Sequence, residues 1–377
     1  MEKENKVDLR GQDVSRLNLD WSELLSLNND KLKFDSKTIF PQSVSKKFTE
    51  RLEIAKNRGL GINKLHNMGY TGKGVTVAII DQPLLVSHEE IKDNIIHYEE
   101  LIPSSGSSTV ASQHGIAVSS VLCGKNIGVL PDAKLVYFST SGIINRLIDE
   151  CFQALENLIE YNKTLPEENK IHVVSVSFGF SYDNISREEQ EKVDKKLKEI
   201  TKRLNENDIF LVSPALNKTH NLYYVGSDRN IEADLEEANN YFEPVYLKNI
   251  KEQNQIQKMP TVLVVPQDRT TVASEKGNND YTYYTDGGVS WATPYLAGIY
   301  ALAKSVDKTL TPDKFFEYAI STGQMKELKG QECSIINPIE LVKSLEYEKG
   351  ANMLNQKIEN EIQIESNNKY IGMENDR

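Results

Sequence analysis

Four side chains of this sequence are of the types that together perform acyl transfer: Asp81, His114, Asn217 and Ser290. A serine hydroxyl is a weak nucleophile until a base takes its proton. Neutral imidazole can do so near pH 7, and a carboxylate holds the imidazole in the required tautomer. A side-chain amide can donate a hydrogen bond to the oxyanion that forms on the attacked carbonyl. Each residue alone also has an ordinary structural explanation, as a turn residue, a cap or a core contact.

The serine lies in the stretch GGVSWATPYLAG, residues 287–298. Its two leading glycines let the chain turn and approach other groups closely. Thr293 and Pro294 predict the start of a helix, because proline suits the first helical turn. The partial positive charge of that helix terminus favours a developing negative charge near the serine oxygen. We therefore expect Ser290 to be held exposed between a turn and a helix.

The elements that must position these residues alternate along the chain. Short apolar runs predict buried strands at 75–80, 134–138, 172–178, 209–213 and 261–265. Amphipathic helices are predicted at 145–160 and after a capping box formed by Ser186 and Glu189. Alternation of this kind predicts an α/β fold with a parallel sheet. Asp81 and Asn217 directly follow predicted strands, where the chemistry of such sheets is found.

Five segments, in the right order, resemble subtilisin-like serine proteases, the subtilase family. The order Asp, His, Ser is that of subtilisin. The matching segments are GYTGKGVTVAIID, HGIAVSSVLCGKNIGVLPDAKL, HVVSVSFGF, LVSPALN and GGVSWATPYLAG. The resemblance covers residues 62–346. It implies a three-layer α/β sandwich around a mostly parallel sheet, and a serine endopeptidase that cleaves peptide bonds through an acyl-enzyme.

The resemblance also implies roles for individual residues. Ser290 matches the nucleophile, His114 the general base, Asp81 the orienting carboxylate and Asn217 the oxyanion donor. Three further residues match the strand that lines the substrate groove: Ser177, Phe178 and Gly179.

Leu216 stands where the family has a glycine in one wall of the primary specificity pocket. Its side chain either fills that slot or points into the core. The neighbouring Pro214 and Ala215 suggest an exposed turn and so favour the slot. We therefore count Leu216 among the substrate-binding residues and expect a preference for small residues before the cut.

Several positions depart from the family pattern: Gln82-Pro83 after the aspartate, Ile116 and Ala117 after the histidine, Leu216, and Val289 before the serine. None removes a catalytic group, so the departures indicate a divergent branch. The alternative interpretation is a catalytically silent subtilase fold that binds or regulates. The other five histidines have no supporting context: His66, His88, His97, His172 and His220. His88 lies among residues typical of a surface.

Composition restricts partners and location. The net charge of −11 argues against binding to nucleic acid or anionic membranes. No apolar run approaches the ~20 residues that span a bilayer, and the first residues have no apolar signal core. The three cysteines are not arranged in a CxxC motif, and so few of them do not predict a disulfide framework. We expect Cys151 to be a buried thiol. We predict a cytoplasmic protein whose partners are protein or peptide substrates.

The chain divides into three expected regions. Residues 1–60 form an N-terminal extension, either a pro-like segment or one that packs on the domain, and we favour packing. Residues 61–347 form the peptidase domain, with an insertion or long loop at 219–260. Residues 348–377 are a polar, mobile tail. Many subtilases bind calcium, so the resemblance leaves calcium open, but no run of Asp and Asn can be assigned to it here; we assign no metal site and no cofactor.

Overall fold

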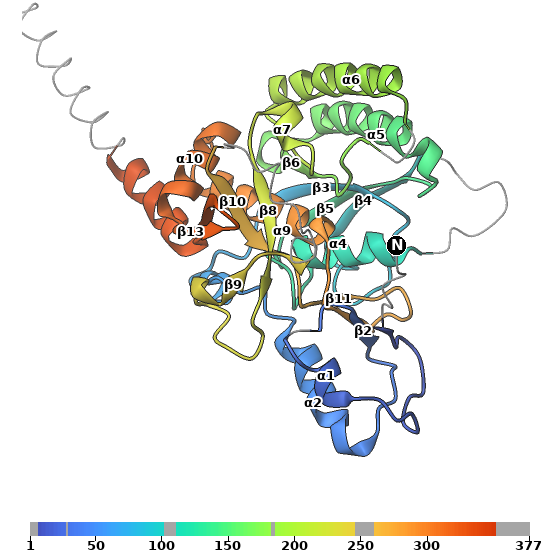
Figure 1. Cartoon of the computed structure of the whole chain (residues 1–377). Helices are drawn as coiled ribbons and strands as arrows, with labels where there is room; N and C mark the ends of the chain where they lie inside the picture. Colours follow the sequence, from blue (N-terminus) through green and yellow to red (C-terminus); the bar gives the residue numbers. More distant parts are fainter. Residues whose placement is uncertain (1–6, 28, 102–110, 182–184, 246–259, 352–377) are drawn as a thin grey trace, which may run out of the picture.

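A five-stranded, all-parallel sheet lies at the centre of the molecule (Figure 1). The computed structural model describes residues 7–27, 29–101, 111–181, 185–245 and 260–351. In spatial order the strands are β4 (Ile95–Glu100), β5 (Lys134–Ser139), β3 (Thr76–Asp81), β6 (Ile171–Ser175) and β7 (Phe210–Val212). Four of these strands are predicted by apolar runs. The edge strand β4 is missed, because most of its residues are only half-buried and show no apolar run.

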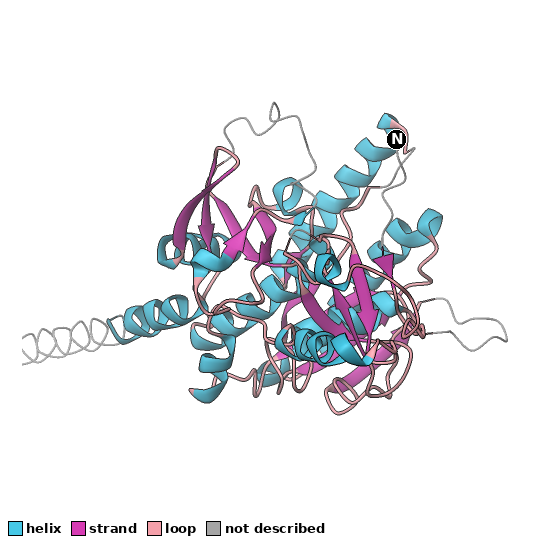
Figure 2. Ribbon diagram, turned by 60° about the horizontal axis from the view of Figure 1, so that its bottom comes forward, coloured by secondary structure: helices cyan, strands magenta, loops and turns pink. Residues whose placement is uncertain are grey.

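Helices cover both faces of this sheet. Along β3, Val77 and Ile79 lie in one core, and Ala78 and Ile80 lie in the other, because successive strand residues point to opposite faces. One face packs against α4 (Gln113–Cys123) and α9 (Val289–Val306). The other packs against α5 (Ile144–Thr164) and α6 (Arg187–Glu206) (Figure 1). Figure 2 shows the helices and strands of the fold from a second direction. This arrangement confirms the predicted three-layer α/β fold.

The predicted local signals for α5 and α6 are confirmed. Ser186 caps α6, and its hydroxyl and the Glu189 carboxylate form both bonds of a capping box. The three cysteines of the chain are free and buried, including Cys151 on the inner face of α5.

A second five-stranded sheet lies beside the first. Its strand order is β13 (Gln324–Leu328), β14 (Gln331–Ile335), β10 (Val262–Pro266), β8 (Tyr224–Arg229) and β9 (Tyr241–Phe242). The predicted strand at 261–265 is therefore correct as β10 but belongs to this sheet. The prediction of a loop at 219–260 is wrong for β8, which pairs in parallel with β10. Residues 246–259 of that segment lie outside the described residues.

The N-terminal segment packs on the domain through a third, four-stranded sheet. Its strand order is β1 (Val7–Asp8), β2 (Leu32–Asp35), β12 (Tyr281–Tyr284) and β11 (Thr270–Ala273). Strand β2 pairs antiparallel with β12, a few residues before Ser290. Phe34, Phe48 and Tyr283 form a small core with helices α1 (Trp21–Leu24) and α2 (Gln42–Ile54).

Three short helices complete the described elements: α3 (Ile62–Asn67), α7 (Leu216–Thr219) and α10 (Pro312–Thr322). Residues 338–351 form a last helix, whose first half packs into the main core through Leu341, Val342 and Leu345 and whose far end points away from the body (Figure 1). Of the predicted tail at 348–377, residues 352–377 lie outside the described residues.

Candidate active site

Asp81 and His114 meet at the carboxyl end of β3. Asp81 is the last residue of the strand, and its side chain is only 6% exposed. His114 lies in the first turn of α4, where the Ser112 hydroxyl caps the helix by accepting from the His114 backbone N–H. The distance from His114 Nδ1 to Asp81 Oδ1 is 2.6 Å. Because a carboxylate only accepts, Nδ1 carries the proton and the neutral ring presents a lone pair at Nε2.

A glycine lets α4 approach the end of β3 this closely. A Cβ atom on Gly115 would lie 2.4 Å from the carbonyl oxygen of Gln82 and 2.6 Å from the hydroxyl of Tyr137. The chain after Asp81 is tied to the same helix start, since the Ser112 N–H donates to the Pro83 carbonyl at 2.7 Å. The Gln82-Pro83 departure from the family pattern thus places backbone acceptors against α4.

Asp81 changes the basicity of His114. Burial of the imidazole disfavours its charged form, but the negative charge of Asp81 and the hydrogen bond outweigh this effect. The pKa of His114 therefore lies above its usual value of 6.5. Such a ring is a stronger base than a free imidazole and is stabilised once protonated.

Ser290 lies in the first turn of α9, which begins five residues before Pro294 and not at it. The predicted helix start is therefore wrong. Gly288 precedes the helix with φ 65°, a conformation that favours glycine. The next side chain, Trp291, has its ring centroid 5.5 Å from that of His114. The serine turn, residues 287–290, therefore lies beside the histidine. Within the described part of the chain, no hydrogen bond joins the Ser290 hydroxyl to His114.

Leu216 and Asn217 are adjacent in the short helix α7, yet they face in different directions. Leu216 is 1% exposed and packs in the main core with Phe210 and Val212. The expectation that it lines a substrate slot is therefore wrong. Asn217 is exposed, and no hydrogen bond to another described residue holds its side-chain amide. A helix turns each successive side chain by about 100°, so one residue points inward while the next reaches solvent.

The three residues predicted to line the substrate groove follow the end of β6 and are half-buried. Phe178 packs against the core beneath α5 and α6. The Ser177 hydroxyl donates to the backbone carbonyl of Ser290 at 3.0 Å, so its polar group is used inside the protein. Contact of Ser177, Phe178 and Gly179 with substrate stays a prediction.

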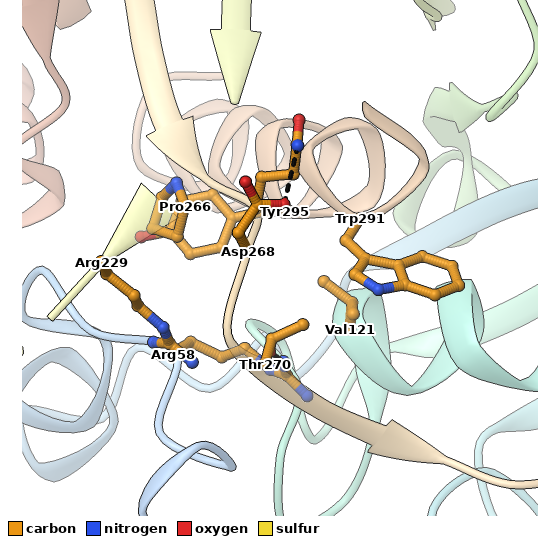
Figure 3. Close-up of a pocket in the computed structure, with 9 residues that line it drawn as sticks. Arg58, Val121, Arg229, Pro266, Asp268, Thr270, Trp291 and Tyr295 are labelled. Atoms are coloured by element: carbon orange, nitrogen blue, oxygen red, sulfur yellow. Dashed lines mark hydrogen bonds between the residues drawn. The ribbon is translucent and has the colours of Figure 1, made fainter. Parts of the chain in front are cut away.

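A buried carboxylate that the sequence analysis missed also reaches the serine turn. Asp268 is 0% exposed and lines a small pocket with Trp291, Tyr295 and two arginines (Figure 3). It accepts from the Gly287 N–H at 2.9 Å and from the Val245 N–H at 2.8 Å. Burial raises the pKa of Asp268 to about 7, although these N–H donors oppose the shift. The signal that could have identified Asp268 is its place two residues beyond the carboxyl end of β10, since Asp81 likewise stands at the carboxyl end of its strand.

The remaining histidines stay outside this group of residues. His88 is fully buried and not among surface charges as expected. Its Nδ1 accepts from the Glu90 N–H, so Nε2 donates to the Asp280 carbonyl at 3.0 Å. Among the described residues, no three His, Cys, Asp or Glu side chains are placed to hold a metal ion. In the same part of the chain, no helix has the length and apolar character needed to cross a membrane.

Comparison with curated proteins gives a short match. The chain is 30% identical over 96 residues to the minor extracellular protease Vpr of Bacillus subtilis (strain 168). That match covers 22% of this chain and 12% of the length of that protein.

Comparison with solved structures gives longer matches at low identity. The PatG macrocyclase domain superposes with a TM-score of 0.50 and 14% identity, over 76% of this chain and 94% of that one. The prenylagaramide maturation protease PagA superposes with a TM-score of 0.48 and 16% identity, over 76% of this chain and 98% of that one. The PatG macrocyclase domain therefore shares the fold of this chain. The model of the Subtilase family, Peptidase S8, matches residues 72–334. The chain therefore belongs to the subtilase family, as a divergent, protease-like member.

Proposed function

We propose that this chain is a serine endopeptidase. The observation that carries the proposal is the 2.6 Å contact between His114 and Asp81 at the carboxyl end of β3, beside the turn that carries Ser290. Family membership implies peptide substrates. Asp81 ends β3, Asn217 follows β7, and His114 and Ser290 lie in the first turns of α4 and α9. The proposed catalytic residues are Asp81, His114 and Ser290, with Asn217 as the oxyanion donor.

In the proposed reaction, Ser290 Oγ attacks the carbonyl carbon of the scissile peptide bond. His114 Nε2 takes the serine proton, and Asp81 stabilises the resulting imidazolium. The Asn217 amide donates to the oxygen that becomes negatively charged. His114 then gives the proton to the leaving amine, which departs and leaves an acyl group on Ser290. A water molecule then attacks the acyl carbon while His114 takes its proton, and His114 passes that proton to Ser290 Oγ as the bond to the acyl group breaks and the acid product leaves.

The test combines covalent labelling with turnover. A fluorophosphonate probe should label the wild-type chain, and Ser290→Ala should abolish both labelling and hydrolysis of a peptide library. His114→Ala should keep the Ser290 hydroxyl but label far more slowly. Peptide hydrolysis by Ser290→Ala at close to the wild-type rate would show that Ser290 is not the nucleophile.

A second candidate is a catalytically silent subtilase that binds peptides without cutting them. It draws on the lack of a hydrogen bond between Ser290 and His114 within the described residues. Such bonds are often long in ligand-free sites and shorten when substrate binds, so we give precedence to the enzyme. A wild-type chain that binds peptides but neither reacts with the probe nor hydrolyses any library member would favour the silent protein.

We also propose that the chain works in a reducing compartment such as the cytoplasm. The support is that its three cysteines are buried and unpaired. Cell fractionation with an antibody against the chain tests the location; recovery in the medium would contradict it.

A further inference from the structure

The first turn of α9 lacks one of its regular hydrogen bonds. In an α-helix, each backbone N–H donates to the carbonyl four residues earlier. Pro294 lies inside α9 and has no N–H. The carbonyl that loses its donor is that of Ser290, the proposed nucleophile.

A distant side chain supplies the missing donor. The hydroxyl of Ser177 donates to the Ser290 carbonyl oxygen at 3.0 Å. Ser177 lies two residues beyond the end of β6, at the same edge of the sheet as Asp81. The contact therefore joins the central sheet to the residue whose hydroxyl is proposed to react.

The same turn is held at a second point. The Gly287 N–H donates to the buried carboxylate of Asp268, three residues before Ser290. Between these two contacts, Gly288 has a positive φ and contributes no side chain of its own. The position of Ser290 thus depends on backbone contacts made from outside α9.

We propose that Ser177 is a positioning residue, whose hydroxyl sets the distance between Ser290 Oγ and His114 Nε2 by holding the Ser290 carbonyl. The proposal rests on the proposed function, since it assigns Ser177 to the same reaction. The side chain of Ser290 and its held carbonyl belong to one residue, so a shift of this carbonyl moves the hydroxyl too. A misplacement of 1 Å at a reacting group can cost about 10²-fold in rate.

Ser177 can affect the reaction in two ways, by contact with substrate or by positioning Ser290. A residue that only contacts substrate changes KM and leaves labelling of the free enzyme unaltered. A positioning residue changes kcat and the rate at which a small fluorophosphonate reacts with Ser290, because the attacking hydroxyl itself is displaced. The two readouts together identify which role applies.

The experiment uses the full chain and a matched pair of variants. Thr at position 177 keeps a hydroxyl on a branched side chain, whereas Val has the same shape without it. We expect Ser177→Val to lower kcat and the labelling rate by about 10- to 10²-fold, with KM little changed. Ser177→Thr should retain most of both rates. The proposal would be overturned if Ser177→Thr and Ser177→Val lost equal amounts of kcat and labelling rate, or if only KM changed.

A second background tests the role of Pro294 directly. Pro294→Ala restores an N–H that can donate to the Ser290 carbonyl. In that background, Ser177→Val should cost less than about a third of its effect in the wild-type background, because the two donors replace each other. Equal costs in both backgrounds would show that the carbonyl contact is not the cause. The Thr and Val comparison still decides the question if Pro294→Ala does not fold.

A control and a separate failure mode complete the design. Ser305→Ala removes a hydroxyl from the far end of α9, where it donates to the Leu302 carbonyl, and should leave every rate unchanged. Lack of wild-type turnover and labelling would contradict the proposed function itself. Wild-type turnover that needs Ser290 but is unaffected by Ser177→Val would contradict only the positioning role.

Discussion

Asp81 and His114 form one half of the candidate site, and the turn that carries Ser290 forms the other. In the first half, a side-chain hydrogen bond of 2.6 Å joins residues that stand at the ends of a regular strand and a capped helix. In the second half, side chains from elsewhere hold backbone groups of the turn: Asp268 at Gly287 and Ser177 at the Ser290 carbonyl. In the first half the two side chains that meet stand on regular elements and contact each other directly, whereas in the second half side chains outside α9 hold the backbone on either side of the serine hydroxyl.

This difference indicates where distant substitutions can reach the chemistry. Strand β3 pairs with β5 as far as Asp81 and with β6 as far as Ile79, so the strand that carries Asp81 has a neighbour on each side. The serine turn has a glycine with positive φ and a proline within its helix, so its own backbone specifies it less. Variants in the first half should change the reaction through the charge and tautomer of His114. Variants in the second half should change it through the position of the Ser290 hydroxyl.

The largest effect is expected where the first half is broken. Asp81→Asn should lower kcat by about 10⁴-fold while the fold persists, because an amide does not hold the imidazole in the reactive tautomer. Steady-state hydrolysis of a peptide, with circular dichroism as the check on folding, measures it. A loss of less than tenfold would remove Asp81 from the proposed mechanism.

Asn217, the proposed oxyanion donor, should act on the acyl group that Ser290 attacks, and its replacement therefore tests the second half of the site. Asn217→Ala should lower kcat by about 10²–10³-fold with KM little changed, because the amide acts on the transition state. Since Asn217 is exposed, thermal stability should be unaffected. A change in KM alone would instead identify Asn217 as a residue that binds the ground state.

Leu216, the residue before Asn217, should affect the stability of the fold and not the reaction. Leu216→Ala should lower the free energy of unfolding by about 2–5 kcal/mol, because it leaves a cavity in the main core. The ranking of peptides with Ala, Leu or Phe before the cut should stay as in the wild type. A changed ranking with unchanged stability would return Leu216 to the substrate slot.

Asp268, beside the second half, should make the stability of the fold depend on pH. Its pKa is raised from 3.8 to about 7 in the folded chain, so the folded state binds this proton more tightly. The stability contributed by the protonated carboxyl is complete below about pH 4 and is lost as the pH rises through about 7. The slope is at most ~1.4 kcal/mol per pH unit. Urea unfolding of wild type and Asp268→Asn from pH 4 to 8 tests this; parallel curves would exclude Asp268 as the source.

The smallest expected effect is a displaced pH profile of the reaction. The base must be neutral to act, so kcat/KM should rise with pH through the pKa of His114. Asp81 raises that pKa, which places the midpoint above the 6.5 of a free imidazole. In Asp81→Asn the midpoint should fall, whereas in Ser177→Val it should stay. A wild-type midpoint below 6.5 would contradict the influence of Asp81.

The sequence by itself determined the order and types of the chemical groups and most of the strands that carry them. Apolar runs report burial on both faces, so β3, β5, β6 and β7 could be predicted, as could the capping box of α6, which needs only residues three apart. Asp81 at the end of β3 followed from the same reasoning. These are local signals, and neighbouring residues are enough to read them.

Only the tertiary structure decided the direction of Leu216, the start of α9 at Val289 and the burial of Asp268. Each depends on what packs against the residue and not on its sequence neighbours. A leucine after Pro214-Ala215 has no local preference between slot and core, and the main core receives it. Proline fits a first helical turn, but a helix can begin earlier where the carbonyl that loses its bond finds a donor. That donor, Ser177, lies just beyond the end of β6, and only the folded chain brings its hydroxyl to 3.0 Å from the Ser290 carbonyl oxygen.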